Sequence, residues 1–261
     1  YDDSTMHFHN LPFELWTALF MFLAGGSFSL YYRAYIKGPT VILRNAEFRT
    51  YLGIVLTAML LIALNLILSM GMDGDMAARV AVFQVTSLST TGFVSADFET
   101  WPTFSKMVLL LLMVIGGCAG STASGIKVAR LILLVRNARA VVLQKLNPNR
   151  VVDITLTGAH VDSAMLMRVG TFFFLYLAVI FVTAFLLAMD GLLPFDAVAV
   201  AITTIGNIGP AFGIVSATST YAPLSDFSKA ILCLTMLLGR LEIFTLLILL
   251  QPSFWRRTYR W

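Results

Sequence analysis

Six apolar runs of helix length are the feature that most constrains this chain. The runs at residues 11–36, 51–71, 165–189 and 227–250 reach the length of about 20 residues that a helix needs to cross the hydrocarbon core of a bilayer. Only 12% of the residues are charged, which is about half the share found in soluble domains. We therefore predict an all-α membrane protein that crosses the bilayer several times.

The other two apolar runs, at residues 104–117 and 126–143, are separated by a small, polar stretch, GGCAGSTASG at 116–125. At 1.5 Å per residue the first of these runs covers only about 21 Å, which is too short to span. Non-helical backbone at membrane depth is tolerated only inside protein or beside a water-filled cavity. The sequence thus predicts one helix that is broken at residues 116–125.

Charged residues are distributed unevenly among the loops. Lys and Arg cluster around residues 33–49, 130–150 and 256–260, whereas the other loops are mainly acidic. By the positive-inside rule the basic loops and the C-terminus are cytoplasmic. The chain begins with Tyr1 in polar sequence and shows no signal peptide, so we expect a fragment whose N-terminal part is missing.

Two long outer segments, residues 72–103 and 190–226, each begin with a short, mostly apolar stretch. These stretches, AARVAVFQVTSLS and FDAVAVAITT, are too short to span but long enough to enter the membrane and return. Each leads into a Thr/Gly loop, in SLSTTGF and AITTIGN, and aligning the two pairs Gly92 with Gly206. We predict two re-entrant pore helices, each followed by a loop.

The helices that follow these loops also match each other. FSKMVLLLLMVIGG begins at Phe104 and FSKAILCLTMLLGR at Phe227, and MFLAGG at residues 21–26 is a partial third copy. Chance similarity between membrane helices is the alternative, but four features recur in the same order. The sequence therefore predicts a repeated unit of helix, re-entrant pore helix, loop and helix.

Backbone that enters the membrane without helical hydrogen bonds needs another partner. In a cation filter, carbonyl oxygens replace the hydration shell of the ion, and glycine gives the backbone the freedom to aim them. Thr hydroxyls can add ligands or brace the loop. The short helix before each loop points its partly negative C-terminal end at the same place, which also favours a cation. These loops are therefore interpreted as parts of a cation filter.

The motifs resemble those of the Trk/Ktr/HKT superfamily of K⁺ transporters, most closely its bacterial Trk uptake subunits. The resemblance rests on TTGF after a re-entrant helix, on GGCAGSTASGIKVARL in the broken helix, and on TIGNIGP with GRLEIFTLLILLQPSFWRR near the C-terminus. Members have four such repeats around one pore in a K⁺-channel-like fold. The resemblance implies that this chain holds the last helix of the second repeat and all of the third and fourth.

The boundaries that follow divide the chain into four parts. They are an outer loop with the last helix of repeat 2 (1–36), a cytoplasmic linker (37–50), repeat 3 (51–150) with pore helix and filter at 78–95 and a helix broken at 116–125, and repeat 4 (151–261) with pore helix and filter at 194–210, a helix at 227–250 and a cytoplasmic tail.

The resemblance also implies roles for individual residues, with transported K⁺ at the filter as the only metal ion. The filter strands it implies are Thr90, Thr91, Gly92 and Phe93 in repeat 3 and Thr204, Ile205, Gly206 and Asn207 in repeat 4. The intramembrane gate it implies consists of Gly116, Gly117, Cys118, Ala119, Gly120, Ser121, Thr122, Ala123, Ser124, Gly125 and Lys127.

Arg240 occupies the second Gly position of the repeat motif, and a charge near mid-membrane costs about 2.5–3.5 kcal/mol on insertion scales. The resemblance implies a pore barrier below the filter, whereas an ion pair with Glu242 or snorkelling is the alternative. Residues two apart lie on different faces of a helix, which disfavours the pair. Lys127 either contributes to the barrier or marks the cytoplasmic interface. Asp97 and Glu99 either enrich cations at the pore mouth or are ordinary loop acids.

The resemblance implies K⁺ uptake across the bacterial inner membrane, under the control of a cytosolic TrkA-like nucleotide-binding regulatory subunit. We expect a homodimer in contact with membrane lipid, and no nucleic-acid partner. The sequence has no Walker loop, dinucleotide fingerprint, zinc spacing or catalytic triad, which argues against an enzyme and against a nucleotide bound by this chain. The alternatives are a Na⁺-permeable or Na⁺-coupled Ktr/HKT-type transporter and a non-conducting scaffold.

Overall fold

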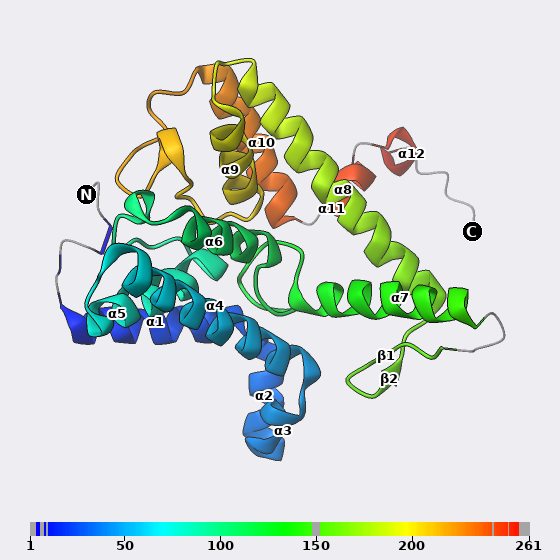
Figure 1. The fold of residues 1–261 in the computed structure, drawn as a ribbon. Helices are drawn as coiled ribbons and strands as arrows, with labels where there is room; N and C mark the ends of the chain where they lie inside the picture. Colours follow the sequence, from blue (N-terminus) through cyan, green and yellow to red (C-terminus); the bar gives the residue numbers. More distant parts are fainter. Residues whose placement is uncertain are drawn as a thin grey trace.

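The structure is a computed structural model that describes residues 4–5, 8, 10–147, 152–241, 243–249 and 251–255. Nearly all of its regular structure is helical, with one two-residue antiparallel strand pair (Figure 1). The helices are α1 (Leu11–Gly25), α2 (Phe28–Lys37), α3 (Thr40–Arg44), α4 (Ala46–Met70), α5 (Gly74–Thr90), α6 (Thr103–Ile115), α7 (Val128–Leu146), α8 (Ser163–Ala188), α9 (Pro194–Ile205), α10 (Asp226–Arg240), α11 (Ile243–Leu249) and α12 (Pro252–Trp255). The strands are β1 (Thr155–Leu156) and β2 (Ala159–His160), and short 3₁₀ turns occur at Phe98–Thr100 and Gly213–Val215.

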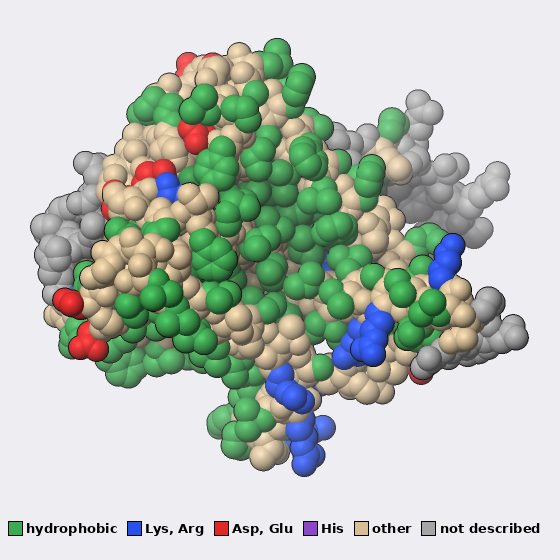
Figure 2. Space-filling view, viewed as in Figure 1, with side chains coloured by type: hydrophobic (Ala, Val, Ile, Leu, Met, Phe, Trp, Pro, Cys, Tyr) green, Lys and Arg blue, Asp and Glu red, His purple; other side chains and the backbone are tan. Residues whose placement is uncertain are grey.

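Two of the described helices, α4 and α8, are by themselves long and apolar enough to cross a membrane. Their side chains alternate between inward-facing residues such as Ile62 and Ile180 and outward-facing residues such as Leu60 and Phe181. An outward apolar surface on a helix of this length is what contact with lipid requires. In Figure 2 hydrophobic side chains cover much of the visible surface, while Lys and Arg gather over α2, α3 and α7.

The helices form two similar groups. In one group α5 packs between α1 and α4, with α6 alongside; in the other, α9 packs between α8 and α10. Contacts between α6 and α9 join the groups, and α7 runs from the first group to the far end of α8 (Figure 1). In each group a short inner helix thus packs between two other helices.

The inner helices α5 and α9 are short because they are surrounded by protein. Every residue of α5 from Phe83 to Thr90 is buried, and so is every residue of α9 from Ala199 to Ile205. Small side chains such as Ala81 and Ala201 allow neighbouring helices to approach closely. Short helices thus lie within the ranges 78–95 and 194–210, where pore helices were predicted, although α5 already begins at Gly74.

Two helices that were expected to be continuous are interrupted, and the expected linker is partly helical. The run at 11–36 is not one helix, because α1 and α2 meet at an angle of 92°. The helix expected at 227–250 ends at Arg240, and a second helix begins at Ile243. The linker expected at 37–50 contains α3 and the first turn of α4.

The bend between α1 and α2 has a packing cause. A Cβ on Gly25 would lie 2.3 Å from Tyr51 Oη, and one on Gly26 would lie 1.9 Å from Tyr31 Oη. Tyr31 and Tyr51 donate hydrogen bonds to the last carbonyls of α1, at Leu23 (2.9 Å) and Phe22 (3.1 Å). Two glycines and two tyrosines thus end α1, which run length alone did not reveal.

Candidate pore loops and intramembrane loop

The loop after α5 is built around Ser87, a fully buried residue in the last turn of the helix. The Ser87 carbonyl accepts from the amides of Thr91 (2.7 Å) and Gly92 (3.0 Å), and its hydroxyl donates to the Phe93 carbonyl. Gly92 has φ +87°, a conformation that costs other residues free energy. One serine therefore fixes the tight return that follows the helix.

The loop after α9 is built in the same way around Thr203. Its carbonyl accepts from the Ile208 amide (3.0 Å), and its hydroxyl donates to the Pro210 carbonyl (2.8 Å) and accepts from the Gly209 amide (3.1 Å). Gly209, with φ +115°, is the positive-φ glycine of this loop. Thr203 thus does in repeat 4 what Ser87 does in repeat 3.

This geometry corrects the pairing of Gly92 with Gly206. Gly206 has φ −74° and ψ −11°, and its amide donates to the Ile202 carbonyl at 3.0 Å, so it continues the helix. The sequence alignment paired Thr90 with Thr204 and, two residues later, Gly92 with Gly206. The first glycine after α9 that shares the positive φ of Gly92 is Gly209, and Asn207 also has positive φ (+52°).

The predicted filter threonines brace their helices. The Thr90 hydroxyl donates to the Thr86 carbonyl (3.0 Å) and the Thr204 hydroxyl to the Val200 carbonyl (2.6 Å), which is the usual back-bonding of a helical threonine. Both side chains are buried. These hydrogen bonds lie within α5 and α9, at the ends from which the loops start.

The two loops meet directly. A Cβ on Gly92 would lie 1.8 Å from the Ile208 carbonyl oxygen, so no side chain fits at this position. Further out, the rings of Phe98 and Phe212 pack edge to face at 5.4 Å. Glu99 links the loops because it binds Lys106 Nζ (2.6 Å) and accepts from the Gly213 amide (3.0 Å). Glu99 is thus tied into the structure, whereas the sequence suggested only a mouth charge or a loop acid.

Residues 116–125, where the sequence predicted a broken helix, lie between α6 and α7. Residues 116–127 are not helical, and we call them the intramembrane loop. The loop folds back on itself: the Ile126 amide donates to the Val114 carbonyl (3.1 Å) and the Val128 amide to the Gly117 carbonyl (3.0 Å). Its positive-φ residues are Gly116, Gly120, Gly125 and Lys127.

The intramembrane loop is attached to the end of α1. The amides of Cys118 and Thr122 donate to the carbonyls of Gly25 (2.8 Å) and Ala24 (3.3 Å). These carbonyls have no helical partners because α1 ends at the bend. The amides of the intramembrane loop supply the hydrogen-bond donors that they lack. A Cβ on Gly117 would lie 2.6 Å from the Gly25 carbonyl oxygen, which explains a glycine at this contact.

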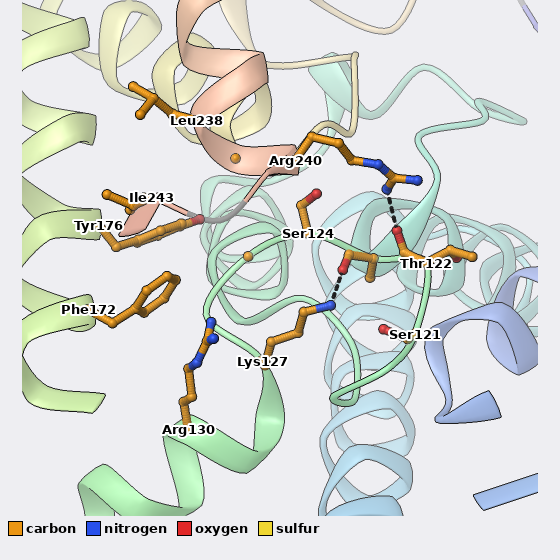
Figure 3. A pocket seen from close by; sticks show the side chains of 13 residues that line it. Ser121, Thr122, Ser124, Lys127, Arg130, Phe172, Tyr176, Leu238, Arg240 and Ile243 are labelled. Carbon is orange, nitrogen blue, oxygen red and sulfur yellow. Dashed lines mark hydrogen bonds between the residues drawn. The ribbon is translucent and has the colours of Figure 1, made fainter. Parts of the chain in front are cut away.

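Arg240 and Lys127 both hold the intramembrane loop (Figure 3). Arg240 Nη1 donates to the Thr122 carbonyl at 2.8 Å, and Lys127 Nζ donates to the Ala123 carbonyl. Asn207, from the loop after α9, donates to Ser124 Oγ at 3.3 Å. Loop, barrier and filter residues expected from the sequence thus lie together. The alternative partner of Arg240, Glu242, lies outside the described residues.

A cavity of about 160 Å³ lies between the intramembrane loop, α8 and α10. Its lining includes Ser124, Lys127, Arg130, Tyr176 and Arg240, so three cationic side chains reach it (Figure 3). The Arg130 guanidinium also lies 3.9 Å from the centre of the Phe172 ring. Positive charge is thus concentrated beside the intramembrane loop.

Comparison with known proteins identifies the family. The family model described as "TrkH: Cation transport protein" matches residues 1–257. The chain belongs to the TrkH family. This family consists of cation transporters, not enzymes, and the chain is accordingly a helical membrane protein. The resemblance noted in the sequence is therefore correct.

Several TrkH relatives match nearly the whole chain. The Trk system potassium uptake protein TrkH of Salmonella typhimurium is 34% identical over 260 residues, and TrkG of Escherichia coli is 30% identical over 263 residues. Each match covers 98% of this chain and 53% of the relative. The crystal structure of the potassium transporter TrkH from Vibrio parahaemolyticus superposes with a TM-score of 0.90 at 33% identity, covering 98% of this chain and 55% of that one. The chain thus spans about half the length of the TrkH relatives it matches.

Proposed function

We propose that the parent protein of this chain takes up K⁺ through a pore to which the two loops contribute half of the selectivity filter. The single observation that supports this most is that two buried short helices end in loops that meet at Gly92 and Ile208. Backbone brought together at helix C-termini is suited to replace the hydration shell of a cation. The names of the relatives, potassium uptake proteins, favour K⁺.

Our proposal for the filter differs from the sequence expectation in repeat 4. In repeat 3 the residues remain Thr90, Thr91, Gly92 and Phe93. In repeat 4 we assign the filter to residues 207–210 in place of the residues 204–207 expected from the sequence. Asn207 belongs to both assignments. The shift is supported by the matching hydrogen bonds of Ser87 and Thr203 and by the positive φ of Gly209.

The intramembrane loop is proposed to be the gate, and Arg240 the charge that holds it below the filter. The hydrogen bond from Arg240 to the Thr122 carbonyl supports this. Control by a cytosolic TrkA-like subunit, a homodimer, the bacterial inner membrane as location and a cytoplasmic C-terminus remain part of the proposal. The word "system" in the names of the relatives favours a complex with other subunits.

The test uses the full-length parent in a bacterial strain that lacks K⁺ uptake, with growth at low K⁺ and Rb⁺ uptake as readouts. We expect wild type to rescue growth. Gly92→Ala should abolish uptake, because its Cβ would displace the Ile208 carbonyl. A parent that moves no monovalent cation even with its regulatory subunit would refute the proposal, and equal Na⁺ and Rb⁺ transport would favour the Na⁺-permeable alternative.

The matched pair Gly209→Ala and Gly206→Ala tests the register of the second loop. Gly209 has positive φ, which costs other residues about 1–3 kcal/mol. Gly206 has helical φ, and its nearest contact outside the helix backbone is the tip of the Ile208 side chain at 3.0 Å. We expect Gly209→Ala to lower K⁺ over Na⁺ preference and Gly206→Ala to leave it nearly unchanged. The reverse result would restore the pairing of Gly92 with Gly206.

A further inference from the structure

Glu47, in the first turn of α4, has a contact that the function described so far does not use. Its carboxylate accepts a hydrogen bond from the amide of Ala119, 72 positions further along the chain. The helix does not need Glu47 as a cap, because the Asn45 side chain already accepts from the Phe48 amide at 3.0 Å. The side chain of Glu47 is thus directed at another part of the molecule.

Ala119 lies within the intramembrane loop, between the residues that bind α1. The Cys118 amide binds the Gly25 carbonyl on one side, and the Thr122 amide binds the Ala24 carbonyl on the other. Those are contacts between neutral backbone groups. Glu47 adds an ionisable side chain as acceptor, and hydrogen bonds to charged groups are stronger than neutral ones.

The surroundings of Glu47 link both ends of the loop. The Glu47 carboxylate also lies beside the backbone of Ala129, in the first turn of α7, and interacts electrostatically with Lys127. The amides at the start of a helix have no helical partners, so an acidic group there is favourable. One side chain of α4 therefore contacts the intramembrane loop and the start of the helix that follows it.

We propose that Glu47 is a positioning residue that holds the intramembrane loop in its obstructing position and couples it to α4. This rests on the proposed gating role of the loop. α4 follows directly on α2 and α3, where basic side chains gather (Figure 2). A movement of these helices would be passed through Glu47 to Ala119.

Single-channel recording on the full-length parent in lipid bilayers tests this inference. Glu47→Ala removes the acceptor, Glu47→Asp keeps the charge but shortens the side chain by one methylene, and Glu47→Gln keeps an acceptor oxygen at the same reach. Arg49→Ala is the matched control, because Arg49 is exposed in the same turn of α4.

We expect Glu47→Ala and Glu47→Asp to raise the open probability about tenfold, within the usual range of coupling between sites. Unitary conductance and K⁺ over Na⁺ preference should not change, because the filter is untouched. Glu47→Gln keeps the acceptor but loses the charge, so it should lie between wild type and Glu47→Ala, and Arg49→Ala should equal wild type. If Glu47 only stabilised the fold, the variants would change the melting temperature but would leave the open probability unchanged.

The outcomes separate the inference from the proposed function. If wild type conducts K⁺ and Glu47→Asp gates like wild type, the coupling role of Glu47 is wrong while transport stands. A change in conductance or selectivity in place of open probability also overturns it. If Glu47→Ala fails to fold, Glu47→Asp decides the question, because it keeps an acidic residue in the first turn. A wild type that conducts no cation overturns both proposals.

Discussion

In both repeats the serine of the Phe-Ser-Lys motif is fully buried and donates a hydrogen bond to a polar residue near the end of the preceding long helix. Ser105 Oγ donates to Asn65 Oδ1, and Ser228 Oγ to Asp190 Oδ2, each at 2.8 Å. The lysines differ: Lys106 binds Glu99 at 2.6 Å, whereas Lys229 lies 3.5 Å from the exposed Asp226. The N-terminal ends of α6 and α10 are thus held by the same kind of serine hydrogen bond.

The C-terminal ends of these two helices differ much more. After α6 the chain forms the intramembrane loop before α7 begins at Val128, while after α10 the next helix begins at Ile243. Equivalent glycines lie at these ends: Gly116 directly follows α6, and Gly239 is the last residue but one of α10. We infer that the close contact of each glycine with neighbouring backbone decides where the helix ends. The residues that follow the glycine decide how many residues separate it from the next helix.

Gly239→Ala should have the largest effect of the changes that test this comparison. Its Cβ would lie 1.9 Å from the Ile205 carbonyl oxygen, so α10 would have to move away from the loop after α9. We expect a fall of several degrees in melting temperature and loss of Rb⁺ uptake. Gly53→Ala is the control, because nothing lies within 4 Å of its Cβ on the exposed side of α4. Equal behaviour of the two variants would show that close approach does not set the break.

Arg240→Ala should have the next largest effect. It removes the hydrogen bond to the Thr122 carbonyl and one of the three cations at the cavity, so we expect Rb⁺ flux to rise severalfold with selectivity unchanged. Arg240→Lys keeps the charge but loses the planar donor group and should lie between wild type and Arg240→Ala. Unaltered flux in Arg240→Ala would assign the residue a structural role at the end of α10.

Glu99→Gln should have a smaller effect. It loses the ion pair with Lys106 but keeps an acceptor for the Gly213 amide, and partly exposed pairs contribute about 1 kcal/mol or less. We expect a small decrease in melting temperature and little change in Rb⁺ uptake, with Glu99→Ala losing more than Glu99→Gln. If both variants lost uptake completely, Glu99 would act on the ion directly and not through the loops.

Asp190→Asn should have the smallest effect and appear mainly as a change in pH dependence. Hydrogen bonds from Ser225 and Ser228 hold the pKa of Asp190 below its ordinary value. The stabilisation is therefore complete above about pH 4, the ordinary Asp value, and is lost as the pH falls through the lower folded pKa. At pH 7 wild type should melt at a slightly higher temperature than Asp190→Asn. At pH 3 the two melting temperatures should be closer together. A difference that grew at low pH would contradict this.

Part of the site could be predicted because clusters of glycine, serine and threonine interrupt otherwise apolar segments. The interruption at residues 116–125, the two short helices and the place of Arg240 beside the intramembrane loop were expected from the repeat and from the resemblance. The pairing of Gly92 with Gly206 failed because Gly206 directly follows α9 and keeps helical backbone angles, whereas Gly92 lies two residues beyond the end of α5 and has positive φ. Glu47 was missed because it looks like any acidic residue of a first helical turn.

The sequence by itself indicated that this chain is a membrane protein, and it placed the interruption that follows α6 at residues 116–125. Hydrophobic length, charge asymmetry and small residues are local properties, so they can be read from the order of residues. Only the tertiary structure decided that α1 and α2 bend by 92°, that Gly209 shares the positive φ of Gly92, and that Glu47 holds Ala119. Each of these depends on which distant backbone groups lack a partner, and that is settled only when the helices pack.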